Sequence, residues 1–164
     1  MNNVFMTSDL HFVHKQIIDY ENRPFRNVDE MNETLVINWN SVVDSATDKV
    51  FVLGDFCFGG IERTKEFLRR LNGYKILVKG CHDPYSVSLF MDSGFKEVYE
   101  YPIIYDQYYM LSHKPLYVSS AMPYANIHGH THGNSFDHVQ SVNVSVEVTE
   151  YKPLNFEYIK KRFK

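Results

Sequence analysis

The chain has 164 residues, of which 44% are hydrophobic and 15% aromatic, and this composition predicts one compact domain over residues 1–164 rather than a disordered chain. Its formal net charge of −3 and pI of about 6.2 provide no global positive field, so nucleic acid is not favoured as a partner. Two cysteines cannot form the disulfide framework of a small secreted protein.

The ends of the chain predict neither export nor membrane insertion. Residues Met1 to Val4 lack a basic segment followed by an apolar one, so we expect no signal peptide. No apolar run approaches the roughly 20 residues of a membrane span. The basic run Lys160-Lys161-Arg162 is interpreted as a solvated helix face. We therefore expect a cytoplasmic protein with no membrane partner, and its oligomeric state stays open.

The first half of the chain alternates between predicted strands and helices. Buried strands are expected at 2–8, 49–53 and 74–79, with a short helix around 15–21 and longer helices over 28–46 and about 61–71. Asn27 and Glu30 form a typical helix cap, and Asn72-Gly73 a helix stop. This alternation is typical of parallel βαβ units.

The second half changes to tyrosine-rich and β-branched runs separated by turns. Pro84 is expected in the first turn of a short helix that ends near Gly94. Strands are predicted at 95–105, 107–112, 125–128 and 138–148, and the last alternates valines with polar residues. We expect these strands to form a second, mainly antiparallel sheet packed on the first, followed by a helix from about Asn155.

Residues that can bind metal ions follow the ends of the predicted strands. The first strand leads into Asp9 and His11, the second into Asp55, and the third into Gly80-Cys81-His82-Asp83. Further along lie His113 and the motif Gly129-His130-Thr131-His132, in which Gly129 and Gly133 would allow close backbone approach. Because ligands collect beyond the carboxyl ends of parallel strands, these residues predict one site.

This ordered set, Asp-x-His, Gly-Asp, Gly-Cys-His-Asp, His and Gly-His-Thr-His, resembles the calcineurin-like metallophosphoesterase superfamily. The resemblance extends from Asp9 to His132 and departs at Cys81, where the family motif normally has asparagine. It implies an α/β fold in which two packed mixed β-sheets are flanked by helices in four layers, αββα.

The resemblance also implies a ligand set. Asp9, His11 and His132 would hold one divalent ion, His113, His130 and Cys81 a second, and Asp55 would bridge both. Two ions at such a site can clamp a phosphoryl oxygen and activate a water. The mixed nitrogen and oxygen donors suit manganese, iron or zinc, and the sequence does not choose among these metals.

Other polar residues near the motifs have predicted roles in catalysis. His82 is expected to be the general acid, with Asp83 holding its imidazole in place. His14, Arg23 and Lys114 are weaker candidates for contacts with the substrate phosphate. His128 and His138 are interpreted as structural.

Cys81 opens three alternatives. Its sulfur reaches less far than an asparagine oxygen, so it could bind a soft ion such as zinc or iron, leave the second metal position weak, or be an oxidation point. A disulfide with Cys57 is a further hypothesis.

The function predicted from these features is hydrolysis of phosphomonoesters or phosphodiesters by a binuclear metal-dependent phosphoesterase, with a small nucleotide-like substrate. A nuclease is also compatible with the motifs. The alternative is a catalytically impaired metal-binding interaction or regulatory module, because Cys81 replaces the family ligand.

Overall fold

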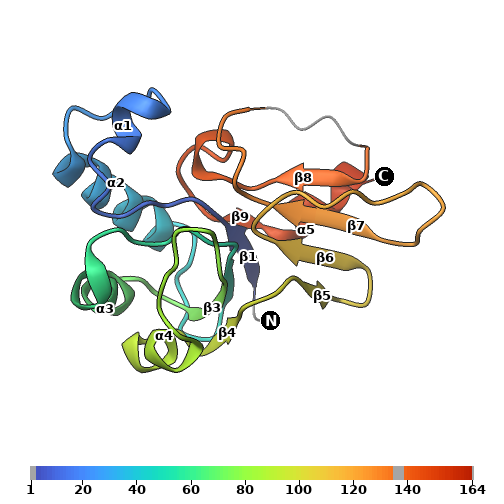
Figure 1. Cartoon of the computed structure of the whole chain (residues 1–164), viewed down its shortest axis with the longest axis horizontal. Coiled ribbons are helices and arrows are strands. Elements are labelled where there is room, and N and C mark those ends of the chain that lie inside the picture. The colour runs from blue at the N-terminus through green and yellow to red at the C-terminus, as the bar shows by residue number, and fades with distance from the viewer. Residues whose placement is uncertain (1–2, 135–138, 164) are drawn as a thin grey trace.

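The computed structural model describes residues 3–134 and 139–163. Within them, one sheet has the strand order β4-β3-β2-β1-β9 and another has the order β5-β6-β7-β8 (Figure 1). The first sheet consists of β1 (Val4–Thr7), β2 (Lys49–Val52), β3 (Tyr74–Val78), β4 (Glu97–Tyr99) and β9 (Leu154–Asn155). The second consists of β5 (Ile103–Tyr105), β6 (Tyr109–Ser112), β7 (Ala125–His128) and β8 (Ser141–Asn143). The predicted α/β fold with two packed mixed sheets flanked by helices is confirmed.

The helices are α1 (Ile17–Tyr20), α2 (Val28–Asn40), α3 (Gly60–Arg70), α4 (Val87–Ser93) and α5 (Phe156–Lys160), with short 3₁₀ helices at Val146–Val148 and Lys161–Phe163. The Asn27 side chain caps α2 by accepting the Glu30 N–H at 2.9 Å, as the sequence predicts. The helix ends at Asn40, earlier than its apolar pattern suggests, and Val43 remains buried in the turn that follows. No helix in the described ranges is long and apolar enough to cross a membrane.

Two hydrophobic clusters lie on opposite faces of the first sheet. Phe5, Val50 and Leu77 face helices α2, α3 and α4, which lie on the side of the sheet away from β5–β8 (Figure 1). Their strand neighbours Met6 and Phe51 face the second sheet. Since successive strand residues point to opposite faces, a strand covered on both sides must be apolar throughout, as these runs are.

The second sheet differs from its prediction in strand direction. β6–β7 and β7–β8 pair in parallel, and only β5–β6 is antiparallel, so the expectation of a mainly antiparallel sheet is wrong. The connection 113–124 and the described parts of the connection 129–140, which exclude 135–138, contain no α-helix, and this makes the short runs look like hairpin strands in the sequence. As a result, the carboxyl ends of β6 and β7 lie at the same edge of the sheet.

Three predicted elements have different bounds. The run 95–105 is not one strand, because β4 joins the first sheet and β5 the second. Within the predicted strand 138–148, residue 138 lies outside the described part of the chain, and regular pairing stops at Asn143 before a 3₁₀ turn. Helix α4 begins at Val87 with Ser86 as its cap, so Pro84 lies before the helix rather than in its first turn.

Candidate metal centre

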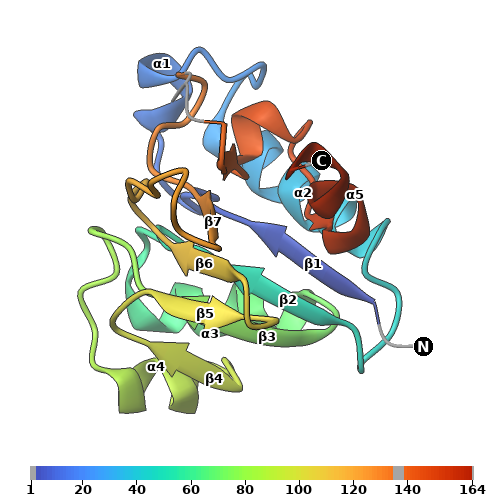
Figure 2. The same ribbon diagram turned by 90° about the vertical axis from the view of Figure 1, so that its right-hand side faces the viewer.

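The loops that follow β1, β2, β3, β6 and β7 converge on one point between the two sheets. Figure 2 shows the arrowheads of β1, β2 and β6 pointing to the same side of the molecule. The side chains brought together there form several overlapping groups of three with donor atoms within 4.8 Å of one another, and two of these groups share no residue. We call Asp9, His11 and His132 the aspartate half, and Cys81, His113 and His130 the cysteine half.

The aspartate half is almost completely buried. Asp9 Oδ1 lies 3.9 Å from His11 Nε2 and 3.7 Å from His132 Nε2. Among the described residues, neither Asp9 Oδ1 nor either ring nitrogen of His11 has a hydrogen-bond partner. Buried polar atoms without partners are costly, so a carboxylate and an imidazole facing each other in this way fit a shared cation.

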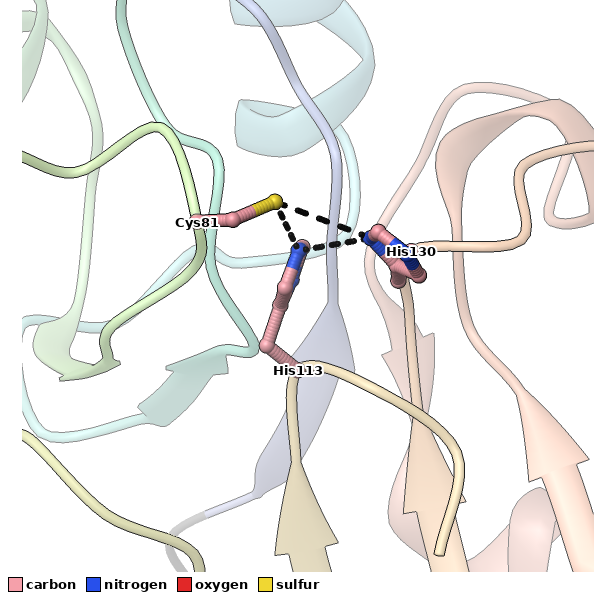
Figure 3. A group of neighbouring side chains, drawn as sticks. All are labelled: Cys81, His113 and His130. Atoms are coloured by element: carbon pink, nitrogen blue, oxygen red, sulfur yellow. Dashed lines mark hydrogen bonds between the residues drawn. The ribbon is translucent and has the colours of Figure 1, made fainter.

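The cysteine half is compact and partly exposed (Figure 3). Cys81 Sγ lies 3.4 Å from His113 Nε2 and 3.7 Å from His130 Nδ1, and the two nitrogens are 3.2 Å apart. A tetrahedral zinc ion, with bonds of about 2.3 Å to sulfur and about 2.0 Å to nitrogen, places such donors roughly 3.3 to 3.6 Å apart. The three separations are close to these values, and the reach of the cysteine sulfur toward an ion stays a prediction.

Asp55 lies between the halves. Its Oδ2 is 3.6 Å from His11 Nε2, 3.4 Å from His113 Nε2 and 3.8 Å from Cys81 Sγ. Its Oδ1 accepts the backbone N–H of His82 at 2.9 Å, which fixes the orientation of the carboxylate. One carboxylate oxygen thus faces both groups of donors.

Arg23 stabilises the backbone of the loop that carries the aspartate half. Its side chain donates to Glu147 Oε1, to the carbonyl oxygens of Leu10 at 2.9 Å and Asp9 at 2.6 Å, and to Met31 Sδ at 3.4 Å. These contacts use all five guanidinium N–H groups of a residue that is only 3% exposed. These contacts stabilise the loop that carries Asp9. They leave no free pair of N–H groups on Arg23 for the predicted bidentate contact with the substrate phosphate.

Glu147 orients His132. Its Oε1 accepts the proton of His132 Nδ1 at 2.9 Å, and this leaves His132 Nε2 as a lone-pair donor facing Asp9. Burial lowers the pKa of His132, but the hydrogen bond to Glu147 and the charge of Asp9 outweigh it and raise this pKa overall. Glu147 was not predicted as a functional residue, because a glutamate that alternates with valines is typical of the solvent-exposed face of any strand.

His113 is held by a backbone acceptor instead. Its Nδ1 donates to the Leu53 carbonyl at 2.8 Å, since a carbonyl can only accept, and Nε2 is left to face Cys81. No carboxylate takes part in that contact.

Asp83 has a different role from the predicted one. Its carboxylate accepts the backbone N–H groups of Asp55 and Gly80, both at 2.8 Å, and of Phe56 at 3.1 Å. A carboxylate that is buried and paired with three N–H groups ties the loop after β2 to the loop after β3. The prediction that Asp83 holds the imidazole of His82 is therefore wrong.

The exposed His82 lies at the mouth of the site. Its ring centroid is 6.0 Å from that of His11 and 5.0 Å from that of Phe58. His14 stacks near the same Phe58 ring at 4.0 Å, and burial lowers its pKa. Lys114 is exposed and adjoins His113.

The remaining histidines and cysteines lie apart from these contacts. His128 is buried in β7, and its Nδ1 contacts the carbonyl oxygen of Gly129 at 2.8 Å. His138 lies outside the described residues. Cys57 and Cys81 are both free thiols, so the hypothesised disulfide is absent.

Five of the seven predicted ligands have a left-handed backbone. Their φ angles are 58° for Asp9, 52° for His11, 55° for Asp55, 69° for His130 and 49° for His132. Such conformations cost L-residues on the order of 1 to 3 kcal/mol each and cluster at functional sites. This strain is independent support for a functional role of these loops.

Close backbone approach depends on two glycines in particular. A Cβ on Gly54, whose φ is +94°, would lie 2.5 Å from Gly80 Cα and from His113 Nδ1. A Cβ on Gly129 would collide with the side chains of Ser8 and Asp9. Gly133 has no such contact, because the nearest neighbour of a Cβ there would be Glu147 Cβ at 4.0 Å.

The ionisation of the site differs from one candidate ligand to another. Burial, followed by the charge of Arg23, lowers the pKa of His11 to about 2, so its imidazole is neutral and able to bind a cation. Burial and the Asp55 carboxylate raise the pKa of Cys81. A cation bound there would have to displace the thiol proton.

Comparison with known proteins first defines the class. Nuclease MPE from Pseudomonas putida shares the fold, with a TM-score of 0.53 and 16% identity over 79% of this chain and 61% of that one. The chain is thus an α/β protein that shares the fold of this nuclease and has candidate metal-binding residues. The crystal structure of AQ665 from Aquifex aeolicus, a protein of unknown function, is more similar, with a TM-score of 0.77 and 26% identity over 98% and 99% of the two chains.

Sequence comparison then identifies the family. The uncharacterized protein MJ1445 of Methanocaldococcus jannaschii is 38% identical over 174 residues, which cover 98% of this chain and 91% of the relative. The chain belongs to the same family as MJ1445. The gene 66 protein of Mycobacterium phage L5 is 36% identical over 86 residues, 51% of this chain and 41% of that protein. No family profile matches the chain.

Proposed function

We propose that the chain is a binuclear metal-dependent phosphoesterase that acts on phosphodiesters. The observation that carries the proposal is the position of Asp55 Oδ2 between two separate groups of three donors. Asp9, His11 and His132 would hold one ion of manganese, iron or zinc, and Cys81, His113 and His130 the other. Two such ions would stabilise the charge on a phosphoryl oxygen and would activate a water.

The residues around the ions supply the proton and position the substrate. His82 is exposed at the mouth of the site, and its backbone N–H is held by Asp55 Oδ1 at 2.9 Å. An imidazole at this position can donate a proton to the leaving oxygen. Lys114, which is exposed next to His113, adds positive charge for the phosphate.

Two pockets flank Cys81 and support a substrate with two ester arms. A pocket of 300 Å³ is lined by Val78, Lys79, Pro102, Lys114 and Leu116 as well as Cys81. Another, of 270 Å³, is lined by Cys81, His82 and Tyr85 and by Phe58, which is 39% exposed. A monoester has one arm and a diester two, so this arrangement favours a diester with a planar group against Phe58. The name of the structurally similar nuclease is consistent with this choice.

Hydrolysis assays on the metal-loaded chain test the proposal. We expect faster turnover of bis-p-nitrophenyl phosphate than of p-nitrophenyl phosphate. Phe58→Ala should raise KM for the diester several-fold, by roughly 1 kcal/mol of lost aromatic contact. The control Ile37→Ala removes an exposed apolar side chain from α2, away from both pockets, and should change nothing. Faster hydrolysis of the monoester would contradict the diester preference.

The second candidate is a metal-binding interaction or regulatory module with impaired catalysis, and Cys81 is the feature that favours it. The distances from Cys81 Sγ to His113 and His130 are those of a ligand, which argues against impairment. Cys81→Asn separates the two functions. A large gain in turnover would mark the cysteine form as impaired, and we expect no such gain.

A further inference from the structure

The basic run Lys160-Lys161-Arg162 borders a pocket that lies apart from the candidate metal centre. Lys160 Nζ pairs with Glu157 Oε1 at 2.5 Å. Arg162 pairs with no carboxylate among the described residues, and its guanidinium carbon lies 5.6 Å from the centroid of the Tyr158 ring. Arg162 and Tyr158 both line a pocket of about 480 Å³, which we call the β9 pocket. Arg162 therefore brings a positive charge to the border of a cavity.

The β9 pocket has apolar walls at the edge of the first sheet. Phe5 of β1, Val42 beyond α2 and Pro153 next to β9 line it from three separate segments. Val148 is 45% exposed and Tyr158 is 51% exposed, so part of this apolar surface is in water. Sites for small molecules have volumes of roughly 300 to 1,000 Å³ and mainly apolar walls. The flat rings of Pro153 and Tyr158 suit a ligand with a planar body.

The polar groups of the β9 pocket favour an anion. Thr149 is 8% exposed, and its hydroxyl has no hydrogen-bond partner among the described residues. Asn155 Oδ1 already accepts a backbone N–H at 2.9 Å, which leaves the amide N–H groups of Asn155 as donors. Lys152 Nζ lies 3.4 Å from Glu150 Oε2, so these two charges offset each other and Arg162 supplies the remaining positive charge. Because polar groups without partners are costly, a ligand that accepts from these donors would stabilise the pocket.

The turn that leads into β9 has a strained backbone. Glu150, which lines the pocket, has a φ angle of 54°, and the next residue, Tyr151, has one of 58°. The Tyr151 N–H donates to the Val146 carbonyl oxygen at 2.9 Å, and this bond holds the turn in place. Left-handed residues other than glycine are uncommon and cluster at functional sites. The strain is consistent with a turn that is shaped to receive a ligand.

We propose that the β9 pocket binds a nucleoside monophosphate. The base would lie against the apolar walls and the rings of Pro153 and Tyr158. The phosphate would accept from Arg162, whose planar guanidinium matches two phosphate oxygens. The hydroxyls of the sugar would meet the carboxylate of Glu150 and the hydroxyl of Thr149. Binding forms hydrogen bonds and an ion pair, and no covalent bond changes.

The β9 pocket is separate from the candidate metal centre. None of the residues that line it is a candidate metal ligand. The proposal therefore does not depend on the proposed phosphoesterase activity. A metal centre can also hold a phosphate, so the test must keep that second mode of binding out of the measurement.

Isothermal titration calorimetry of the full chain with AMP, in the presence of a chelator, tests the proposal. We expect one AMP to bind per chain. Adenosine lacks the phosphate and ribose 5-phosphate lacks the base, so each should bind at least about 10-fold more weakly than AMP. Ribose 5-phosphate that binds as tightly as AMP would overturn the proposal, and so would an absence of AMP binding.

Two variants of the pocket locate the bound AMP. Arg162→Gln should weaken AMP binding by about 10-fold, because a hydrogen bond to a charged group is lost. Thr149→Val should weaken it several-fold without lowering Tm, because the hydroxyl has no partner in the chain to lose. Unchanged AMP affinity in Arg162→Gln would overturn the proposal.

Two matched controls complete the experiment. Lys161→Gln removes the neighbouring positive charge, which does not line the β9 pocket, and should leave AMP affinity unchanged. Phe58→Ala, beside the candidate metal centre, should leave it unchanged as well. AMP binding that is lost in Phe58→Ala and kept in Arg162→Gln would place AMP at the centre and overturn the proposal. AMP binding in a chain without phosphodiester hydrolysis would keep this inference and reject the proposed function, and hydrolysis without AMP binding would do the reverse.

Discussion

The aspartate half and the cysteine half of the centre are built from the same kind of loop at the end of a parallel strand, but they are supported in different ways. The aspartate half rests on a buried ion pair, in which Arg23 and Glu147 fix Asp9 and His132. In the cysteine half His113 donates to the backbone carbonyl of Leu53, and Cys81 is exposed. The difference indicates one rigid, buried position beside one that is accessible and depends on a thiol.

Removing the shared ligand should affect both halves. Asp55→Asn keeps an oxygen for the His82 N–H but removes the charge between the two groups. We expect a loss of roughly 10³-fold in kcat/KM for bis-p-nitrophenyl phosphate, or about 4 kcal/mol of transition-state stabilisation. Metal analysis should show fewer ions per chain. Asp44→Asn, at an exposed aspartate, is the control. If Asp55→Asn keeps an activity within tenfold of that of the unaltered chain, the bridging role of Asp55 is contradicted.

His82 follows Cys81 directly in the sequence. Loss of the His82 side chain should slow the chemical step without changing the number of metal ions bound per chain. His82→Ala should lower kcat by about 10²-fold for a dinucleoside monophosphate, whose leaving sugar hydroxyl needs a proton. The loss should be smaller for bis-p-nitrophenyl phosphate, because p-nitrophenolate is a stable anion. Equal losses on both substrates would show that His82 does not act as the general acid.

The aspartate half can be weakened alone through its outer support. Glu147→Gln removes the charge that orients His132 and pairs with Arg23, so affinity for the ion of this half should fall about 10-fold to 100-fold. Isothermal titration calorimetry with manganese measures this change. In zinc K-edge absorption, zinc bound in the cysteine half should keep one sulfur neighbour. Glu150→Gln, at an exposed glutamate paired with Lys152, is the control.

The convergence of the candidate ligands was predictable because each lies within a few residues of a strand end that is visible in the sequence. Their supports were not, because they depend on contacts between distant segments. Arg23 and Glu147 are separated by 124 positions, and no local pattern connects them. Likewise, Asp83 follows His82 directly in the sequence, but its carboxylate meets backbone N–H groups of the loop after β2.

The strand directions in the second sheet could not be predicted from local sequence patterns either. Its strands were located from tyrosine-rich and β-branched runs, but their direction depends on where the long connections 113–124 and 129–140 return. The positive φ angles of Asp9, His11 and His132 were not predicted either, because aspartate and histidine adopt a left-handed backbone more often than most residues but do not require it.

The smallest expected effect concerns the exposed thiol. Because burial and Asp55 raise the pKa of Cys81, the reactive thiolate is scarce at neutral pH in the metal-free chain. Alkylation of Cys81 by iodoacetamide should therefore keep rising above about pH 8.5, where an ordinary thiol is half ionised. Zinc should block the reaction. Mass spectrometry follows Cys81, with the buried Cys57 as an internal control, and a rate that levels off below pH 8.5 would contradict the raised pKa.

The most direct test of the binuclear centre is anomalous diffraction from crystals of the chain equilibrated with zinc and manganese, recorded at both absorption edges. We predict two peaks roughly 3.5 to 4 Å apart on either side of Asp55 Oδ2, with the zinc peak on the side of Cys81. A single peak, or a Cys81 sulfur that binds neither ion, would contradict the account.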